Sequence, residues 1–263
     1  MNKTDYECAE IIDDSEDEEY IIMPKKTKRT IKPQPVLNKC HNESPNVYEI
    51  GVDEAGRGPL FGRVYTAAVI LPKDDTFDHF KMKDSKKFHS KKKIEEVAEY
   101  IKQHALAWYV SFEDEKTIDD KNILQATQQS MRNSILEVRK QFNKKLEGLE
   151  ERKDYSYNLL IDGNYFTPIT MLNKKNNKIE SLPYLTIEGG DNKYSSIAAA
   201  SILAKTERDK YIDELCKENP TLGEYYGIDS NKGYGAKKHL DGIKEHGITI
   251  WHRRSFGICK NYI

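Results

Sequence analysis

Two adjacent carboxylates, Asp53 and Glu54, carry the densest chemical signal in this sequence of 263 residues. They close an alternating apolar stretch, and a glycine-flanked arginine, Gly56-Arg57-Gly58, follows at once. The end of a strand fixes the backbone, so carboxylates there can meet others that arrive from neighbouring strands. Capping of a turn would explain a lone acid, but it does not call for an arginine between glycines. We therefore interpret this segment as part of a catalytic centre.

Two further acids stand at similar places. Asp162 closes the apolar run 159–161, and Asp191 follows a pair of glycines and precedes a helix rich in small residues. Taken singly, each is better interpreted as the cap of a turn or a helix. Together with Asp53 and Glu54, however, they make four acids at three strand ends. We expect these four side chains to meet in one cluster.

Such a cluster predicts metal-dependent chemistry. Neighbouring carboxylates raise one another's pKa values unless a cation neutralises them. Hard oxygen ligands select Mg²⁺ or Mn²⁺ over softer metals. Two such ions can activate water and stabilise the leaving oxygen in phosphodiester cleavage. The pattern therefore predicts a nuclease in which these four acids are both the metal ligands and the catalytic residues.

Basic and imidazole groups are less specific. Lys86 and Lys87 lie in a lysine-rich stretch, residues 81–93, and two readings are equally good: phosphate contacts or the solvated start of a helix. His239 or His252 could shuttle a proton, although a structural or surface role is the stronger reading of each.

The elements that must position these residues follow from the apolar periodicity. We expect strands near residues 46–52, 64–71, 106–112, 157–162 and 184–188, and helices over 91–103, 122–142, 195–216 and 237–245. Asp119 or Asp120 is the expected cap of the long helix. Residues 173–181 are rich in lysine and asparagine and are expected to form an exposed loop. This order of strands and helices predicts a layered α/β domain with a helical C-terminal part.

Composition limits the class of protein. Hydrophobic residues make up 37% of the chain, enough for a core, while charged residues reach 32%. The net charge of -1 does not by itself indicate a nucleic-acid partner, so any basic surface must be confined to one part of the protein. The four cysteines are scattered, which favours a reducing compartment over a zinc site or a disulfide framework. No apolar run approaches the roughly 20 residues of a membrane span, and we expect a cytoplasmic protein.

The first 45 residues differ from the rest. An acidic block at 13–19 and a basic block at 25–29 are punctuated by prolines. Blocks of like charge with prolines are typical of a disordered tail, and we expect residues 1–45 to be one. A localisation signal or a nucleic-acid arm is the alternative for the basic block.

Seven segments in order carry a family resemblance. The first reads GVDEAGRGPLFGRVYTAAVIL at residues 51–71. The others are KDSKKF at 83–88, NILQAT at 122–127, IDGN at 161–164, GGDNKYSSIAAASILAKTERD at 189–209, NKGYGAKKH at 231–239 and HRRSFG at 252–257. Together they resemble ribonuclease HII, the type 2 ribonuclease H family. The resemblance covers roughly four-fifths of the chain.

The resemblance implies a ribonuclease H-like α/β fold, in which helices flank a central mixed sheet and a helical C-terminal subdomain follows. The catalytic domain would then span residues 46–263, divided into a core at 46–205 and the helical part at 206–263. The regions around 142–155 and 173–181 look longer than a compact family core needs, and we expect surface insertions there.

The resemblance also assigns roles to residues. The metal-binding carboxylates of the family fall on Asp53, Glu54, Asp162 and Asp191, which would hold two Mg²⁺ or Mn²⁺ ions during catalysis. The Gly-Arg-Gly element falls on residues 56–58.

In the family this Gly-Arg-Gly element senses the 2′-OH of the ribonucleotide through its backbone. That makes chemical sense, because only the 2′-OH distinguishes RNA from DNA locally and glycines allow a close backbone approach. The family's sugar-stacking tyrosine falls on Tyr234, which stands in a Lys-Gly-Tyr context. Lys86 and Lys87 complete the expected substrate-binding set.

The implied activity is that of an endoribonuclease. It would hydrolyse the phosphodiester 5′ to ribonucleotides, in RNA/DNA hybrids and at single ribonucleotides embedded in duplex DNA. The products would carry 3′-OH and 5′-phosphate ends, and the roles would be RNA primer removal and ribonucleotide excision repair. Nucleic acid is the expected partner, a membrane is not, and a monomer is the family's usual state.

Two other functions are also compatible with the sequence. A DNA nuclease could share the fold, because one fold hosts several phosphoryl-transfer functions. The Gly-Arg-Gly and Lys-Gly-Tyr elements argue against it, since a DNA nuclease has no 2′-OH to sense. A non-catalytic module, in which the acids bind Ca²⁺ or cap turns, predicts no cleavage at all.

Overall fold

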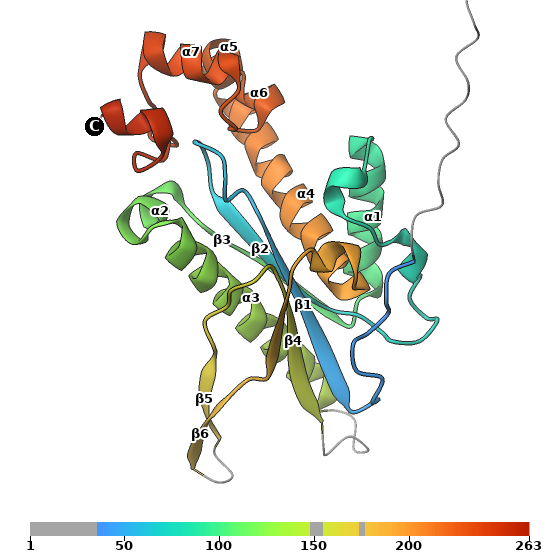
Figure 1. The fold of residues 1–263 in the computed structure, drawn as a ribbon. Coiled ribbons are helices and arrows are strands. Elements are labelled where there is room, and N and C mark those ends of the chain that lie inside the picture. Colours follow the sequence, from blue (N-terminus) through green and yellow to red (C-terminus); the bar gives the residue numbers. More distant parts are fainter. Residues whose placement is uncertain (1–35, 148–154, 174–176, 263) are drawn as a thin grey trace, which may run out of the picture. The chain divides into compact units, whose positions relative to one another are not determined.

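A five-stranded mixed sheet forms the centre of the computed structural model, which describes residues 36–147, 155–173 and 177–262. The strands follow the order β3-β2-β1-β4-β7 across the sheet (Figure 1). They are β1 (Val47–Ala55), β2 (Val64–Ile70), β3 (Ala107–Glu113), β4 (Ser156–Asp162) and β7 (Tyr184–Ile187). β2 runs antiparallel to both β1 and β3, whereas β1, β4 and β7 are parallel. The predicted mixed sheet is confirmed, with each expected strand within a few residues of its place.

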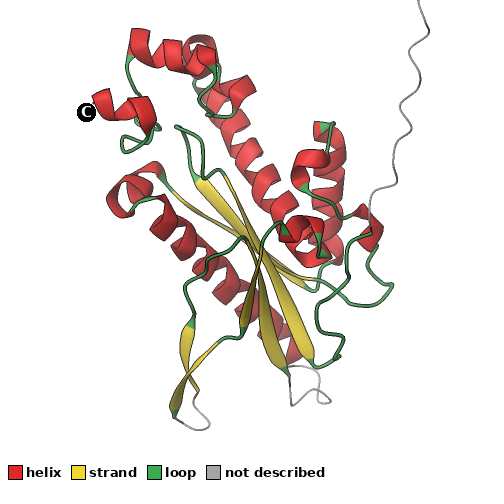
Figure 2. Ribbon diagram, in the orientation of Figure 1, coloured by secondary structure: helices red, strands yellow, loops and turns green. Residues whose placement is uncertain are grey.

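Helices cover both faces of this sheet (Figure 2). They are α1 (Lys91–His104), α2 (Glu115–Lys121), α3 (Ile123–Leu146), α4 (Ser195–Glu218), α5 (Thr221–Tyr226), α6 (Ile228–Asn231) and α7 (Lys237–His246). Short 3-10 helices are His79–Lys81, Ser85–Lys87, Gly190–Asn192 and Gly257–Tyr262. One apolar cluster joins β1 and β4 to α3, and a second joins β2 to α1 and α4. The expected flanking of the sheet by helices is therefore confirmed.

β1 shows how the sequence selects these layers. Tyr48, Ile50 and Val52 alternate along the strand and are buried in the cluster with α3. Gly51 faces α4, and a Cβ atom there would lie 2.2 Å from the carbonyl carbon of Ser196. The strand carries glycine because the helix backbone occupies the space of a side chain, as the small residues of α4 predict.

The helical C-terminal part is joined to the sheet layer by α4, which runs without interruption through the boundary expected at 205/206. A third apolar cluster, formed by Phe61, Ile212, Leu222, Ile243 and their neighbours, is the core of this part. Phe61 comes from the loop between β1 and β2. The C-terminal helices are thus packed around the loop that follows Asp53 and Glu54.

The cap of the long helix differs from its prediction. Asn122 caps α3 by accepting a hydrogen bond from the amide of Gln125 at 3.1 Å. Asp119 and Asp120 lie inside α2. Asp119 instead accepts hydrogen bonds from the backbone of Arg254 and Ser255. Asp119 therefore makes a tertiary contact in place of the helix cap that the local sequence predicted.

The disordered tail predicted for residues 1–45 includes ten residues, 36–45, that are folded onto the domain. Residues 36–45 pack against the domain: Leu37 is buried, and the amide of Asn38 donates to the carbonyl of Lys193 at 2.8 Å. Glu49 accepts hydrogen bonds from the amides of His41 and Asn42. These long-range partners order a stretch whose composition resembles the tail. The rest of the predicted tail, residues 1–35, lies outside the described residues.

Two predicted surface regions also contain regular structure. β5 (Thr170–Asn173) pairs antiparallel with β6 (Lys178–Ser181), so the expected loop is a hairpin, with residues 174–176 outside the described part. Its polar side chains indicated exposure correctly but could not reveal that the two backbones pair. Phe142 and Leu146 are buried in the α3 cluster, so the insertion expected from residue 142 does not begin there. Residues 148–154 lie outside the described residues.

Throughout the described ranges, no helix combines the length and the apolar character that a membrane span requires.

Candidate active site

Asp53 and Glu54 stand at the C-terminal end of β1, where the strand approaches α4. Asp53 faces α4 and is almost fully buried, at 5% exposed. Its Oδ1 accepts a hydrogen bond from the amide of Glu54 at 2.7 Å, and the neutral hydroxyl of Ser201 on α4 lowers the pKa of the carboxyl against the effect of burial. Glu54 reaches the Arg57 guanidinium, whose Nη1 lies 3.3 Å from Oε1. The two acids of the first strand are therefore held differently, one by neutral donors and one by a cation.

Parallel pairing brings the other two acids to the same edge. β4 pairs with β1 so that Ile161 lies opposite Val52, which sets Asp162 beside Asp53. Asp191 follows β7, the next parallel strand, and lies in the turn of 3-10 helix at Gly190–Asn192. The amide of Gly190 donates to Oδ1 of Asp162 at 2.7 Å.

These acids share one pocket of about 350 Å³ with the other predicted site residues. Its lining includes Asp53, Glu54, Asp162, Asp191, Gly56, Arg57, Gly58, Lys86 and Tyr234. Lys87 is the exception among the predicted residues, because it does not line the pocket. Its ammonium group instead donates to the side-chain carbonyl of Asn192, which bonds to the Asp191 carboxylate.

Burial and mutual repulsion make this pocket costly for negative charge. Burial raises the pKa of Asp53 well above its usual range, and the charges of Glu54 and Asp162 raise it further. Burial also raises the pKa of Glu54, against the opposing effect of Arg57. The pKa of Asp191 is raised by burial and by the carboxylates of Asp84 and Asp162. A cation placed among these groups would relieve the repulsion.

The oxygen-only donor set fits a hard divalent cation. Within the described residues, however, no three His, Cys, Asp or Glu side chains already converge tightly enough to hold a metal ion. The hydrogen bonds above explain this, since Arg57 engages Glu54, Gly190 engages Asp162 and Asn192 engages Asp191. The chemistry of these oxygen donors fits a hard divalent cation.

Comparison with known proteins identifies the family. The family model described as Ribonuclease HII matches residues 50–259. The chain is 42% identical to the ribonuclease HII of Phocaeicola vulgatus over 226 residues, which is 85% of this chain and 93% of that protein. It is 38% identical to the ribonuclease HII of Neisseria meningitidis serogroup C over 218 residues, 83% of this chain and 96% of the relative.

The chain belongs to the ribonuclease HII family. It is therefore a metal-dependent ribonuclease, a hydrolase, as the sequence resemblance implied.

Solved structures agree on the fold of this ribonuclease. The ribonuclease H2 of Pyrococcus horikoshii matches with a TM-score of 0.53 at 20% identity, covering 82% of this chain and 96% of that one. The ribonuclease HII in the PCNA complex from Archaeoglobus fulgidus matches with a TM-score of 0.54 at 22% identity, covering 80% and 96%. At such identities the likeness shows the fold, and it confirms the predicted ribonuclease H-like architecture.

Several lining residues of the ribonuclease pocket were missed by sequence reasoning. They include Ser201, Lys205, Arg208 and Asp209 of α4 and, from the C-terminal part, Asn231 and Lys232. The four α4 residues recur at helical spacing after an alanine-rich start, so they share one face of the helix. That polar stripe, which begins within the small-residue start of the helix, was the available signal.

The histidines proposed as proton shuttles do not line this pocket. His239 and His252 are both fully buried, and their Nε2 atoms lie 3.1 Å apart. Burial lowers the pKa of His239, and it lowers the pKa of His252 to about 3. Both rings are therefore neutral at pH 7, which favours the structural reading of each.

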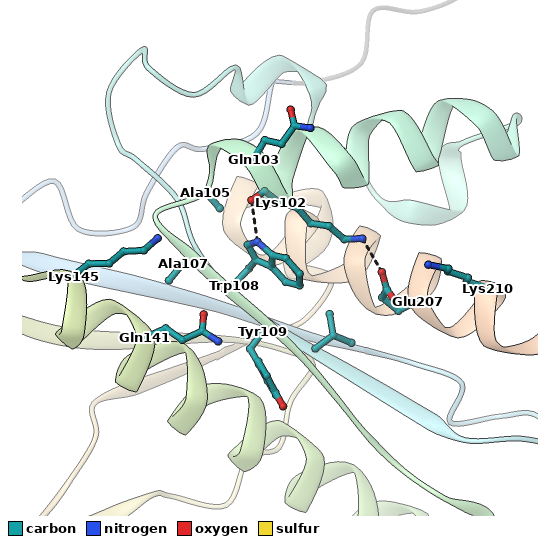
Figure 3. Close-up of a pocket in the computed structure, with 11 residues that line it drawn as sticks. Lys102, Gln103, Ala105, Ala107, Trp108, Tyr109, Gln141, Lys145, Glu207 and Lys210 are labelled. Atoms are coloured by element: carbon teal, nitrogen blue, oxygen red, sulfur yellow. Dashed lines mark hydrogen bonds and ion pairs between the residues drawn. The ribbon is translucent and has the colours of Figure 1, made fainter.

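A second and larger pocket, of about 660 Å³, lies along the outer edge of β3 (Figure 3). It contains none of the predicted site residues. Trp108 on one side of the strand donates its indole N–H to the carbonyl of Lys102 at 3.0 Å. The ammonium group of Lys102 lies 2.8 Å from Glu207. Lys102 and Glu207 are thus paired within the protein, and Lys145 donates to the backbone carbonyl of Leu106.

Proposed function

We propose that this ribonuclease hydrolyses the phosphodiester 5′ to ribonucleotides, both in RNA/DNA hybrids and at single ribonucleotides within duplex DNA. The products would carry 3′-OH and 5′-phosphate ends, which suits RNA primer removal and ribonucleotide excision repair. The observation that carries the proposal is that one pocket unites four carboxylates, the Gly-Arg-Gly turn and Tyr234. We further propose that the chain acts as a monomer.

The carboxylates are proposed as the ligands of two divalent ions, Mg²⁺ or Mn²⁺. Asp53, Glu54, Asp162 and Asp191 supply the oxygen donors, and the raised pKa values of three of them support a site built for cations. When bound, such ions supply an activated water and stabilisation for the leaving oxygen. The ion pair of Glu54 with Arg57 would then open, releasing the arginine toward the nucleic acid.

The Gly-Arg-Gly turn is proposed to recognise the ribose. Gly56 has a φ of +92°, a conformation that L side chains rarely adopt. A Cβ atom on Gly58 would lie 3.6 Å from Cε1 of Tyr234, so the turn and the tyrosine ring are neighbours. This neighbourhood supports a turn whose backbone groups meet a 2′-OH, with the half-exposed tyrosine ring stacking on the adjoining sugar.

Lysines beside the pocket are proposed to bind phosphates. Lys86 lines the pocket, and its charge opposes the raised pKa values of Glu54 and Asp191. Lys87 acts at one remove, by holding Asn192 beside Asp191. Phosphate contacts of this kind set register without reading sequence.

The decisive experiment compares three duplexes with Mg²⁺ or Mn²⁺: all DNA, DNA with one ribonucleotide, and an RNA/DNA hybrid. We expect cleavage of the last two, on the 5′ side of ribonucleotides, with products assigned by end-labelling. Equal cutting of the all-DNA duplex would favour a DNA nuclease, and absence of any cutting would favour a non-catalytic module.

Tyr234 tests the recognition part of the proposal. Tyr234→Ala should reduce cleavage at a single ribonucleotide by roughly 5- to 100-fold, the worth of one stacking contact, and reduce hybrid cleavage less. Tyr225→Ala is the matched control, because Tyr225 is a comparably exposed tyrosine of α5 whose ring stacks on His246. Equal losses on both substrates would contradict the role given to Tyr234.

A further inference from the structure

The dipeptide His252-Arg253 lies buried between the two substrate-recognition elements of the proposed function. One element is the loop 56–63, which contains the Gly-Arg-Gly turn, and the other is the segment 231–234, which ends in Tyr234. Phe61 and His252 form an isolated antiparallel bridge, and the amide of Arg253 donates to the carbonyl of Leu60 at 2.9 Å. The backbone of the dipeptide is thus bonded to the first element.

The side chain of Arg253 donates hydrogen bonds to four backbone carbonyls of loop 56–63. Its Nη2 donates to the carbonyl of Gly56 at 2.6 Å, and its Nε donates to that of Gly62 at 2.8 Å. Its Nη1 donates to the carbonyls of Arg57 at 3.1 Å and Pro59 at 2.8 Å. The guanidinium is fully buried, so these four carbonyls replace its hydration. A rigid fork of five donors suits this task, and lysine has no equivalent geometry.

A second arginine links the two elements directly. Nη2 of Arg208 donates both to the carbonyl of Phe61 at 3.2 Å and to the carbonyl of Lys232 at 3.0 Å. The amide of Leu60 donates to the carbonyl of Gly233 at 2.9 Å. The loop and the segment before Tyr234 are therefore bonded to each other as well as to the C-terminal part.

The buried histidine pair completes the connection to Tyr234. The Tyr234 carbonyl can only accept, so Nδ1 of His239 donates to it, at 2.9 Å. The amide of Thr249 donates to Nδ1 of His252, also at 2.9 Å, so this nitrogen carries no proton. Nε2–H of His252 must then donate to Nε2 of His239. A fixed chain of neutral imidazoles runs from His252 to the backbone of Tyr234.

We infer that Arg253, Arg208 and the pair His239–His252 are positioning residues that set the spacing between the Gly-Arg-Gly turn and Tyr234. This inference rests on the proposed function. Because the turn meets the ribose and the tyrosine meets the next sugar, their spacing determines how well the enzyme accepts a ribonucleotide followed by a deoxynucleotide. Displacement of the turn therefore impairs single-ribonucleotide cleavage more than hybrid cleavage.

The test measures a ratio rather than an activity. For each variant, kcat/KM is determined on the single-ribonucleotide duplex and on the hybrid, beside the thermal unfolding midpoint. Arg253→Lys keeps the charge but loses the fork, and it should lower the single-ribonucleotide value on the order of 10- to 100-fold, as small misplacements do. The hybrid value should fall less, so that the ratio drops. Arg208→Lys provides a second, independent variant should Arg253→Lys fail to fold.

Arg139→Met is the matched control. Arg139 is a half-buried arginine that lies 4.9 Å over the ring of Tyr157, at the opposite end of β4 from Asp162. The Arg139→Met variant should have a lower unfolding midpoint and an unchanged ratio of the two kcat/KM values. An unchanged ratio in folded Arg253→Lys and Arg208→Lys would overturn the inference and reduce these arginines to stabilising residues. Failure of the wild-type enzyme to cut either substrate would instead overturn the proposed function.

Discussion

The pocket beside β3 and the carboxylate pocket differ in how their charges are balanced. The larger one, beside β3, pairs Lys102 with Glu207 at 2.8 Å and with Glu99 at 2.7 Å. Burial alone would lower the pKa of Lys102, yet these two carboxylates raise it. The smaller pocket holds Asp53 beside Glu54 and Asp162, and burial with like charge raises the pKa of Asp53.

This contrast teaches that size does not mark the functional site. An ion that is already paired, such as Lys102 with Glu207 and Glu99, gains little electrostatic energy from a charged ligand. A pocket that confines like charges stores a cost that a ligand of opposite charge relieves, which is why perturbed groups gather at functional sites. The carboxylate pocket is the smaller of the two, but it is the one that requires a cation.

Removal of one carboxylate should have the largest effect. Asp53→Asn or Asp162→Asn removes a proposed metal ligand, and metal stabilisation of the transition state is worth several kcal/mol. Cleavage of ribonucleotide-containing duplex should therefore fall on the order of a thousandfold or more. Steady-state rates with Mg²⁺ or Mn²⁺ check this, with circular dichroism to establish folding. Retention of full activity would remove Asp53 and Asp162 from the catalytic set.

Stability without metal should change in opposite directions in the two pockets. In Asp53→Asn the cost of burying a charge and its repulsion by Glu54 and Asp162 both disappear, so metal-free unfolding should become costlier. In Glu207→Gln a partly exposed ion pair is lost, and stability should fall by less than about 1 kcal/mol. Urea unfolding in EDTA measures both changes. Destabilisation by Asp53→Asn would contradict the account of stored repulsion.

Sequence reasoning succeeded where local pattern and chemistry coincide. The alternation of Tyr48, Ile50 and Val52 predicts β1, and the position of Asp162 at the end of a predicted strand indicated that it could meet Asp53. The Gly-Arg-Gly turn was recognised from the residues themselves, and the family resemblance joined it to Tyr234, which local reasoning could not have done.

The features that sequence reasoning missed depend on long-range contacts. Arg253 stands in a recognised motif, but its task requires carbonyls nearly two hundred positions earlier in the chain, with the Gly56 contact spanning 197 residues. Asp119 was assigned to a helix cap, whereas its hydrogen-bond donors, the amides of Arg254 and Ser255, lie 135 and 136 positions later in the chain. Periodicity and capping rules describe neighbours along the chain, so they could not find either contact.

Acid should affect the buried bases and the buried acids oppositely. The pKa of His252 falls to about 3 in the folded state, while the unfolded side chain binds a proton below roughly pH 6.5. The contribution of His252 to stability is therefore complete above pH 6.5 and is lost as the pH falls toward 3, by about 1.4 kcal/mol per pH unit. An acid whose pKa is raised in the folded state, such as Asp53, instead makes the folded protein relatively more stable as the pH falls.

The difference between wild type and His239→Gln/His252→Gln isolates the histidine effect. Unfolding free energies of the metal-free proteins are measured from pH 7.5 to pH 5. The double variant should be less stable at pH 7.5, and its disadvantage should shrink as the pH falls. A disadvantage that stays constant with pH would contradict the neutral pair.

The two faces of α4 offer the finest comparison, because each lines one pocket. Lys205 lies on the face toward the carboxylates, and Lys210 lies on the opposite face beside Trp108. Lys205→Gln should weaken binding to an uncleavable all-DNA duplex and reduce the salt slope of log K by about 1, as loss of one phosphate contact does. Lys210→Gln should change affinity less than about twofold, within the range of surface substitutions. Fluorescence anisotropy over a salt series measures both slopes. If Lys210→Gln matched Lys205→Gln in slope, nucleic acid would extend over the β3 edge, and the larger pocket would join the binding surface.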